Sequence, residues 1–446
     1  MPERVLSTLN EDGTRRWLKP RLARGRFLRR RQIVGYALIA LFVALPFVEI
    51  GGRPALLLDL VTRELSVFGA VFRPTDGFLL MLLGLTIAVA VFLVTALFGR
   101  VWCGWGCPQT VYLELVFRPI ERRLERTKLP GRAAIRWAIY GVLSLALANV
   151  FLAYFVGVDR LGTWMLGSPL DHPAGFAIVI GVAALVLFDF GYFREQTCIV
   201  ACPYGRLQSV LLDRQSLIVG YDARRGEPRA KPKKRLPVIA QRGDCVACNA
   251  CVQVCPTGID IREGLQMECI GCAQCIDACD TVMAKLGKPP GLIGYTSQDQ
   301  LAGKVRRVLR ARTIIYPALL TAFAALLVWS VGARSVTTVS IGRVAGPSFV
   351  ELPDGKISAA AQLKLENGSD DRRWYQIAVL GPDAALRSQP RWEIAAHRAV
   401  EIPVYIDVPR TSFVHGRRSL ELSIEDGAGF RRTITVTLLG PEGARP

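Results

Sequence analysis

The stretch "CVACNACVQVCP" (245–256) holds four cysteines in C-x2-C-x2-C-x3-C spacing followed by proline, and "CIGCAQCIDACD" (269–280) repeats the spacing. Thiolates at this spacing on a tight loop can bind three irons of one [4Fe–4S] cluster, so the fourth ligand must come from elsewhere. In two-cluster ferredoxins, that ligand is the last cysteine of the other motif. The doubled motif therefore predicts a ferredoxin-like domain over 240–285 with two clusters, one bound by Cys245, Cys248, Cys251 and Cys279 and the other by Cys269, Cys272, Cys275 and Cys255.

The two motifs differ at the residue after the last cysteine. Pro256 follows the first motif as the ferredoxin pattern requires, whereas Asp280 takes the place of proline in the second. The exchange leaves all eight thiols intact and adds a negative charge, which is expected to change the potential of one cluster. A pair of zinc sites is the alternative, because each zinc ion needs only four ligands.

Long apolar runs make up much of the remaining chain, in which 51% of 446 residues are hydrophobic. A helix needs ~20 residues to cross the ~30 Å of hydrocarbon in a bilayer. A run such as "FLLMLLGLTIAVAVFLVTALF" (78–98) offers no polar face to water, which disfavours the alternative of buried helices in a large soluble fold. We expect an integral membrane protein with an α-helical bundle of five transmembrane helices, the first four within 33–193: 33–50, 77–98, 137–158, 173–193 and 313–332.

Basic residues alternate between the segments that join these runs. Residues 1–32 carry ten Lys or Arg, 99–136 carry eight and 194–312 carry nineteen, whereas 51–76 and 159–172 carry three and one. Cytoplasmic loops carry the excess of basic residues, so the N-terminus is predicted in the cytoplasm and the segment after the fifth span outside. The first segment is too charged for a cleaved signal, so the first span is an uncleaved anchor. The net charge of +19 is thereby explained without a nucleic-acid partner.

The two large segments outside the membrane differ in composition. Residues 194–312 are polar, contain many Gly and Pro, and hold ten of the twelve cysteines. A reducing cytoplasm disfavours structural disulfides there. Residues 333–446 hold no cysteine and alternate apolar with polar residues, as in "AVEIPVYIDV" (399–408), which predicts an antiparallel β-sandwich. The sequence leaves its role open between a passive cap and the docking of a partner.

A second cysteine pattern, C-x3-C-P, occurs at 103–108 in "VWCGWGCPQT" and at 198–203 in "QTCIVACPYGR". Each copy follows the cytoplasmic end of a span. The spacing i, i+4 puts the two thiols of a copy on one helical face. The proline suits the first turn of a following helix. A helix N-terminus lowers the pKa of a nearby thiol and so favours the thiolate. Soft thiolates select copper(I), zinc or iron–sulfur clusters, although small buried cysteines are the alternative. The predicted four-sulfur metal site at the membrane surface comprises Cys103, Cys107, Cys198 and Cys202.

Four further residues, one in the fourth span and three in a short outer loop, are candidates. Asp189 lies within the fourth span, where a carboxylate is either functional or reaches toward the nearby interface. The short outer loop, "TWMLGSPLDHP" (163–173), places Met165, Asp171 and His172 close together in sequence. That loop is either a transient copper site or an ordinary solvated connection.

The sequence argues against several other redox cofactors. It holds three histidines, at 172, 397 and 415, and only the first is near a span, whereas transmembrane b-type haem usually needs paired axial histidines. It contains no C-x-x-C-H attachment site, no P-loop and no dinucleotide-binding glycine fingerprint. Electrons are therefore expected to move through sulfur-bound metal. A cytoplasmic electron donor, which the sequence does not identify, would supply them.

Four stretches carry a resemblance to a known family: the doubled cysteine motif, "RVWCGWGCPQTVYLE" (100–114), "CIVACPYGRLQS" (198–209) and "VGYDARRGEPR" (219–229). Over nearly the whole chain the sequence resembles the FixG/RdxA/CcoG family of cytochrome c oxidase accessory proteins. The cysteine motifs alone also fit the wider polyferredoxin group, including membrane quinol-dehydrogenase subunits of nitrate reduction. The stretch 221–229 and the β-rich tail favour the narrower family.

The resemblance implies a multi-pass protein of the bacterial inner membrane with a periplasmic, Ig-like C-terminal domain. It also implies reduction of cupric to cuprous ion for the copper centre of a cbb-type oxidase. Partners would then be membrane lipid, copper ion, and oxidase assembly factors or copper transporters and chaperones. The alternatives are an electron-transfer subunit of a quinol-oxidising chain and an assembly scaffold with structural clusters. The oligomeric state stays open, and a homodimer is compatible with the sequence.

Overall fold

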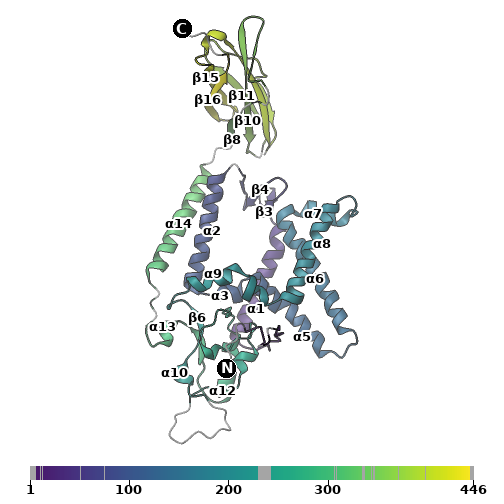
Figure 1. The fold of residues 1–446 in the computed structure, drawn as a ribbon, viewed down its shortest axis with the longest axis vertical. Helices are drawn as coiled ribbons and strands as arrows, with labels where there is room; N and C mark the ends of the chain where they lie inside the picture. Colours follow the sequence, from purple (N-terminus) through teal and green to yellow (C-terminus); the bar gives the residue numbers. More distant parts are fainter. Residues whose placement is uncertain are drawn as a thin grey trace. The chain divides into compact units, whose positions relative to one another are not determined.

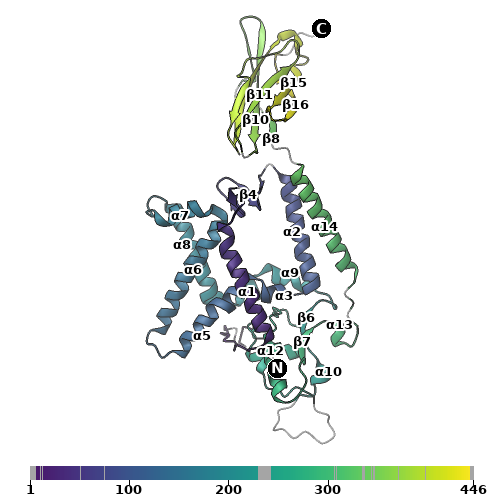
Figure 2. The same ribbon diagram turned by 180° about the vertical axis from the view of Figure 1, so that it is seen from behind.

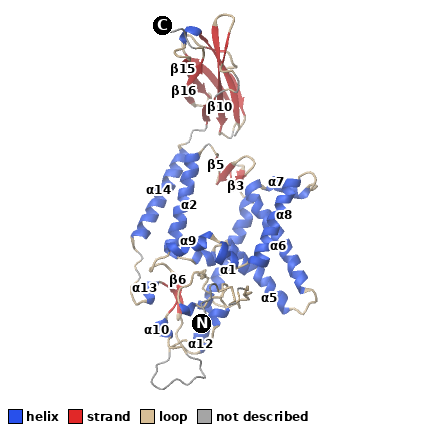
Figure 3. Cartoon of the chain, viewed as in Figure 1, coloured by secondary structure: helices blue, strands red, loops and turns tan. Residues whose placement is uncertain are grey.

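The computed structural model describes residues 7–441 except 11, 13, 51, 75, 230–242, 306, 308, 334–336, 343, 345, 346, 370 and 397. Parts of the predicted N-terminal segment, ferredoxin-like domain and C-terminal domain therefore lie outside the described residues, as does the histidine at 397. The chain divides into two compact units, Met1–Val331 and Gly332–Pro446. The first contains the long helices and all the cysteines, and the second is built of strands (Figure 3).

Five helices in the described part of the chain are long and apolar enough to cross a membrane, which confirms the predicted class of multi-pass membrane protein. Most of their side chains are not buried within the protein, as expected for helices that face lipid. The five helices are α1 (Arg26–Ala44, continued by a 3-10 turn over Leu45–Phe47), α2 (Gly77–Phe98), α6 (Arg132–Val156), α8 (Pro173–Phe188, continued by a π-helical turn over Asp189–Phe193) and α14 (Ala311–Gly332).

The first helix differs from the predicted span 33–50. It begins seven residues earlier, among arginines, because the carboxylate of Asp277 accepts hydrogen bonds from the backbone N–H groups of Phe27 (3.1 Å) and Leu28 (2.7 Å). These donors of the first turn would otherwise lack a partner. Hydropathy identifies only the apolar part of a helix. The start of α1 is set instead by hydrogen bonds to Asp277, which is distant in sequence.

The long helices form two groups, and Figures 1 and 2 show both from opposite sides. In one group, α2 lies beside α14, and Arg310 donates from Nη2 to the carbonyl of Ala96 at 2.9 Å. In the other, α6 packs against α8, and the Tyr154 hydroxyl donates to the carbonyl of Phe42 on α1 at 2.6 Å. The C-x3-C-P segments lie between the ferredoxin-type region and these helices.

Two connections predicted as loops contain regular structure. The segment 51–76 forms small antiparallel sheets, and most of the predicted outer loop 159–172 is helix α7 (Val158–Leu166). Asp59 and Arg160 form an ion pair at 3.2 Å between the two segments. The strands are β1 (Glu49–Ile50), β2 (Arg53–Pro54), β3 (Leu56–Asp59), β4 (Glu64–Val67) and β5 (Ala70–Phe72).

The ferredoxin-type region is built around an antiparallel pair, β6 (Ile218–Tyr221) and β7 (Ile293–Thr296). Helix α11 (Ala250–Gln253) lies within the first cysteine motif, and α12 (Gln274–Lys285) begins within the second. Apolar side chains from these elements pack beneath the cysteines. The short elements of the first unit are α3 (Val101–Trp105), α4 (Pro108–Tyr112), α5 (Arg118–Arg126), α9 (Pro203–Leu211), α10 (Ala223–Gly226), α13 (Gln298–Leu301), a 3-10 turn (Ile261–Glu263) and π-helical turns (Leu113–Phe117 and Thr197–Ala201).

The second unit is an antiparallel β-sandwich, which confirms the predicted fold class. One sheet has the strand order β12-β14-β10-β8, with β9 also paired to β10, and the other has the order β13-β11-β15-β16. Alternate residues such as Leu363, Leu365 and Ile402 fill the core between the sheets. The strands are β8 (Thr337–Gly342), β9 (Phe349–Glu351), β10 (Lys356–Asn367), β11 (Arg373–Leu380), β12 (Ala385–Leu386), β13 (Arg391–Ile394), β14 (Ala399–Pro409), β15 (Arg417–Glu425) and β16 (Arg431–Leu439).

Candidate metal centre

Two cavities in the ferredoxin-type region are lined by the eight cysteines of the doubled motif. The walls of the first include Cys245, Cys248, Cys251 and Cys279, so the last cysteine comes from the second motif. The walls of the second include Cys269, Cys272, Cys275 and Cys255, together with Cys251. The structure therefore groups the thiols in the exchanged arrangement that the spacing predicts.

The backbone of the motifs makes the cavities possible. Ala247 and Asn249, on either side of Cys248, have φ values of 50° and 58°, and Ala273, next to Cys272, has 63°. Residues other than glycine seldom occupy this left-handed region, and they do so mostly in tight turns. The turns wrap the first three thiols of each motif around a common space.

The thiols surround these spaces and do not converge on a point. Within the described part of the chain, no three His, Cys, Asp or Glu side chains are arranged to hold a single metal ion. A zinc ion would bring its sulfur ligands to ~2.3 Å from one centre. Four thiols around a cavity fit the larger [4Fe–4S] cubane, which each cysteine binds through a different iron.

Burial and repulsion from neighbouring thiols raise the pKa of Cys251, Cys269, Cys272, Cys275 and Cys279. Burial comes first for Cys279, whose pKa rises to about 12, and neighbouring Cys251, Cys245 and Cys248 raise it further. Burial likewise raises the pKa of Cys272 to about 12, and Cys275 is raised well above its ordinary range by burial and by the thiols of its own cavity. Such thiols become thiolates when a positively charged group binds among them.

The C-x3-C-P motifs have a different local structure from the one predicted. Helix α3 ends at Trp105, and Cys107 is the extended N-cap residue of α4 (φ −65°, ψ 125°). Cys202 is likewise the N-cap residue of α9, and Cys198 lies in the preceding π-helical turn. The two cysteines of a motif therefore do not share one continuous helical face, because proline at the first position of the next helix interrupts it.

The predicted lowering of the thiol pKa by a helix N-terminus is also not found for Cys103, Cys107 or Cys198. Burial raises the pKa of Cys103 and of Cys198 to about 12. Burial raises the pKa of Cys107 too, although backbone hydrogen bonds from Thr110 and Gln109 act to lower it. Desolvation of a buried thiolate therefore outweighs the favourable field of the helix end.

The structure nevertheless brings the four C-x3-C-P cysteines into one neighbourhood. The pKa of Cys198 is raised, after burial, by Cys107, Cys103 and Cys202, so all four thiols act on one another electrostatically. The thiol of Cys103 donates to Gln208 Oε1 at 3.3 Å. One π-helical turn, Asp189–Phe193, precedes the second motif, and another, Thr197–Ala201, contains Cys198. Turns of this kind occur frequently at functional sites.

Asp189 connects the two motifs. Its Oδ1 accepts from the side-chain amide of Gln109, two residues after Cys107, at 3.2 Å, and also from the hydroxyl of Thr197, next to Cys198. The carboxylate is half-buried and points to partners on both motifs. Asp189 thus has a positioning contact, and the structure does not make it a metal ligand.

Helix α3 packs directly against the second cysteine cavity. A Cβ atom added at Gly104 would lie 2.6 Å from the carbonyl oxygen of Ile270 and 2.8 Å from both Cα and N of Cys272. Real Cβ atoms essentially never approach so closely, so only glycine allows this contact. Trp105 next to it donates from Nε1 to the Tyr295 hydroxyl (2.9 Å), which donates to the carbonyl of Gly271 (2.7 Å).

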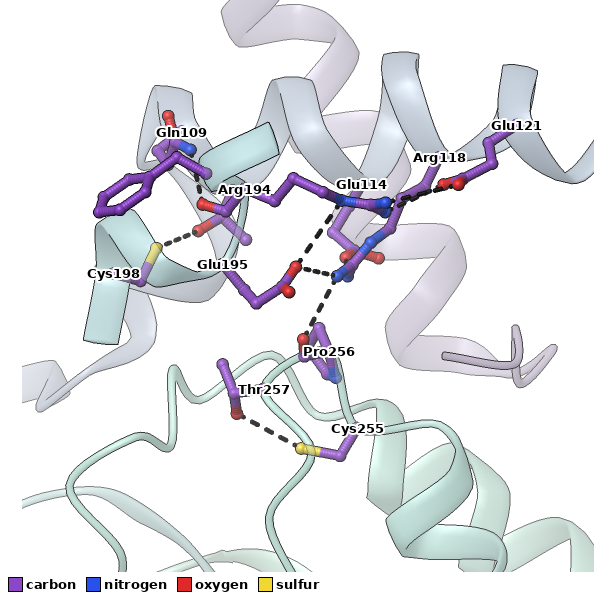
Figure 4. A network of polar contacts seen from close by, with 12 residues as sticks. Gln109, Glu114, Arg118, Glu121, Arg194, Glu195, Cys198, Cys255, Pro256 and Thr257 are labelled. Carbon is purple, nitrogen blue, oxygen red and sulfur yellow. Dashed lines mark hydrogen bonds and ion pairs between the residues drawn. The ribbon is translucent and has the colours of Figure 1, made fainter. Parts of the chain in front are cut away.

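A buried ion-pair network lies between the C-x3-C-P cysteines and the cysteine cavities of the ferredoxin-type region (Figure 4). The sequence did not predict it. Arg118 is 2% exposed, forms an ion pair with Glu114, and donates from Nη2 to Glu195 (3.0 Å) and to the carbonyl of Pro256 (3.4 Å), as Figure 4 shows. Arg194 donates to Glu121 at 2.9 Å. The available signal was the charged stretch from Glu114 to Lys128, which begins six residues after the first C-x3-C-P motif, but surface loops carry similar runs.

The candidate outer copper site gains no support. Met165 packs in an apolar cluster with residues such as Leu152, Leu161 and Val179. His172 is the N-cap residue of α8. A copper site at Met165 and His172 therefore stays a prediction.

Family models describe three parts of the chain. A 4Fe-4S dicluster domain matches residues 193–298, a 4Fe-4S binding domain matches 80–127, and the IG-like fold at the C-terminal of FixG matches 327–441. The last description also groups FixG with the oxidoreductases. Together with the five apolar helices and the cysteine cavities, these matches define a membrane-bound, ferredoxin-type iron–sulfur protein of electron transport.

Three curated proteins resemble the chain over most of its length. Protein RdxA of Cereibacter sphaeroides is 33% identical (84% of this chain, 81% of that protein), and protein RdxB of the same organism is 34% identical (87% of each). Nitrogen fixation protein FixG of Rhizobium meliloti is 30% identical (94% of this chain, 92% of that protein). The chain belongs to the FixG/RdxA/RdxB family.

Proposed function

We propose that this chain is a cupric reductase, which passes single electrons from its ferredoxin-type domain to Cu(II) at the membrane surface. Two [4Fe–4S] clusters would be held by the thiols of the two cavities and would supply reversible one-electron transfer. Copper would be held by Cys103, Cys107, Cys198 and Cys202, because soft thiolates favour the cuprous product. No three side chains in the described part of the chain are already arranged around a single ion, so these thiols would have to draw together as copper binds. The reaction is balanced as one electron lost by the domain for each Cu(II) converted to Cu(I).

The contact between Gly104 and Cys272 carries this proposal. It places the backbone of one C-x3-C-P motif against the backbone of a cavity cysteine, at distances where an added Cβ would not fit. Arg100 strengthens the connection, because it donates to the carbonyl of Cys269 (3.4 Å) and to that of Gly205 beside the second C-x3-C-P motif (3.3 Å). A scaffold with purely structural clusters would not need this close approach.

The basic segments and the family support a proposed cellular setting. By the positive-inside pattern, the N-terminus and the cysteine-rich region would lie in the cytoplasm and the β-sandwich in the periplasm of a bacterial inner membrane. The electron donor would then be a cytoplasmic protein or small molecule. The cuprous ion would serve the copper centre of a cbb-type oxidase, through oxidase assembly factors or through copper transporters and chaperones.

One observation favours a second candidate. The 4Fe-4S binding model matches residues 80–127, which contain Cys103 and Cys107 but none of the doubled motif. The four C-x3-C-P thiols could therefore hold a further iron–sulfur cluster, and the chain would then serve as an electron-transfer subunit of a quinol-oxidising chain.

Metal analysis of the purified, anaerobically reconstituted protein distinguishes the two candidates. The copper reductase is expected to hold about eight irons per chain, four for each cubane. It should also bind added Cu(I), and the double variant Cys103→Ser with Cys198→Ser should lose this binding. About twelve irons per chain, falling to about eight in that double variant, would support the third cluster and contradict the copper site.

A further inference from the structure

A cavity of about 670 Å³ lies between the start of α1 and helix α5, and no cysteine lines it. Its volume is within the range of ~300–1,000 Å³ that is typical of ligand pockets. It is lined by the segment before α1, the first turns of α1, the π-helical turn before α5, and α5 itself. Neither the proposed electron transfer nor the copper site uses this space.

The lining of the cavity is strongly basic. It contains nine Arg or Lys side chains and three glutamates. Each glutamate already has a cationic partner: Glu114 pairs with Arg118, Glu121 with Arg194, and Glu125 with Lys19. The other cations form no ion pair within 4.0 Å with any residue that the structure describes: Arg21, Arg24, Arg31, Arg122, Arg123 and Arg126.

Two deeply buried guanidinium groups in the wall each have one nitrogen atom without a hydrogen-bond partner among the described residues. Arg31 is 1% exposed, and its Nη2 has no partner among the described residues, while its Nε donates to the carbonyl of Gly104 at 2.5 Å. Arg118 is 2% exposed, and its Nε is likewise unpartnered within the described ranges. A buried N–H without an acceptor is costly, and native proteins almost always supply one. Both atoms have almost no accessible surface, so an anion in the cavity would reach them only if the two side chains turned toward it, and would otherwise bind the more exposed cations.

The cavity also has an apolar wall that extends along a membrane helix. Leu28, Tyr36 and Leu115 line it together with the arginines. Tyr36 lies ten residues after the start of α1, which is ~15 Å along the helix at 1.5 Å per residue. A ligand that fills the cavity therefore needs an anionic group at one end and an apolar part at the other.

We propose that this cavity binds the phosphate headgroup of an anionic phospholipid, with part of an acyl chain against the apolar wall. Basic pockets between membrane helices on the cytoplasmic side bind such headgroups. Free phosphate shares the charge but would leave the Tyr36 side chain, which is 51% exposed, uncovered. The proposal is independent of the copper chemistry, because none of its residues is a cysteine.

The test uses the full-length protein in nanodiscs of phosphatidylcholine with added phosphatidylglycerol, and counts retained lipids by native mass spectrometry. The wild-type protein is expected to retain one phosphatidylglycerol after delipidation and no phosphatidylcholine. A triple variant, Arg24→Gln, Arg123→Gln and Arg126→Gln, should lose on the order of 100-fold in affinity, at about fivefold for each removed charge. These three side chains are exposed, so their replacement is not expected to disturb folding.

A matched triple variant controls for general attraction to anionic membranes. Arg29→Gln, Arg30→Gln and Arg132→Gln remove three exposed charges from α1 and α6 that do not line the cavity, and should leave lipid retention unchanged. Equal loss in both variants, or equal retention of the two lipids by the wild type, would overturn the proposal. Displacement of the lipid by millimolar inorganic phosphate would overturn it also, in favour of a soluble phosphate ligand.

Discussion

The side-chain amide of Gln109 donates to Asp189 at 3.2 Å, and this hydrogen bond ties the first C-x3-C-P motif to the end of a membrane helix. The same oxygen of Asp189 accepts from Thr197, next to the second motif. One carboxylate thus fixes the spacing of two cysteine pairs that lie 95 residues apart at Cys103 and Cys198.

Replacing Asp189 tests this positioning contact. Asp189→Ala removes both hydrogen bonds, which should destabilise the protein by about 1–3 kcal/mol and reduce metal retention by the four thiols. Asp189→Asn keeps an oxygen that both donors can reach, so it should stay close to wild type. Thermal unfolding and metal content report the two effects, with Asp159→Asn as an exposed control. An Asn variant as damaged as the Ala variant would show that the charge of Asp189 is what matters.

A methyl group at Gly104 should separate the two cysteine centres. Gly104→Ala forces a shift against Ile270 and Cys272, whereas Gly141→Ala on α6 meets no atom within 4 Å in the described part of the chain. We expect Gly104→Ala to slow electron transfer from the domain to copper at least tenfold, with cluster content nearly unchanged. Stopped-flow absorbance measures the rate. Equal rates in both variants would mean that the contact is not on the electron path.

The exchanged arrangement of the cavity cysteines predicts which cluster each variant loses. Cys255→Ser should damage the cluster held with Cys269, Cys272 and Cys275, and Cys279→Ser should damage the other, because each supplies the fourth ligand to the opposite motif. Electron paramagnetic resonance of the reduced protein separates the two signals. If Cys255→Ser instead removes the signal that depends on Cys245 and Cys248, the assignment is wrong.

The orientation in the membrane is tested by reporter fusions. Alkaline phosphatase is active only outside the cytoplasm, so a fusion after residue 441 should be active and a fusion after residue 290 inactive. The expected result follows from the basic residues of the segments 1–32, 99–136 and 194–312. The reverse result would place the cysteine-rich region in the periplasm.

The sequence predicted those features that depend on local spacing or on long apolar runs. The grouping of Cys255 with Cys269 and the helix Gly77–Phe98 agree with the structure because both follow from regular patterns. Features that depend on contacts distant in sequence were missed. Asp277 sets the start of α1, and Arg118 joins Glu195 and Pro256, although neither pairing has a local signal.

The raised pKa of Cys103 was missed for a different physical reason. Its position near a helix end suggested a stabilised thiolate, but burial raises the pKa to about 12. The degree of burial depends on how α3 packs on the loop around Gly271, where the backbone has a φ of 66°. That packing is a tertiary property, which residue spacing does not encode.

Anaerobic oxidation of the reduced protein by Cu(II) tests the proposed copper reduction most directly. The clusters are reduced chemically, excess reductant is removed, and cluster reoxidation is followed against Cu(I) formed. The double variant Cys248→Ser with Cys272→Ser, which is expected to lack both clusters, measures the background of Cu(I) formed by free thiols. We predict one Cu(I) above that background for each electron that the clusters lose. Clusters that stay reduced in the presence of excess Cu(II) would contradict the proposed function.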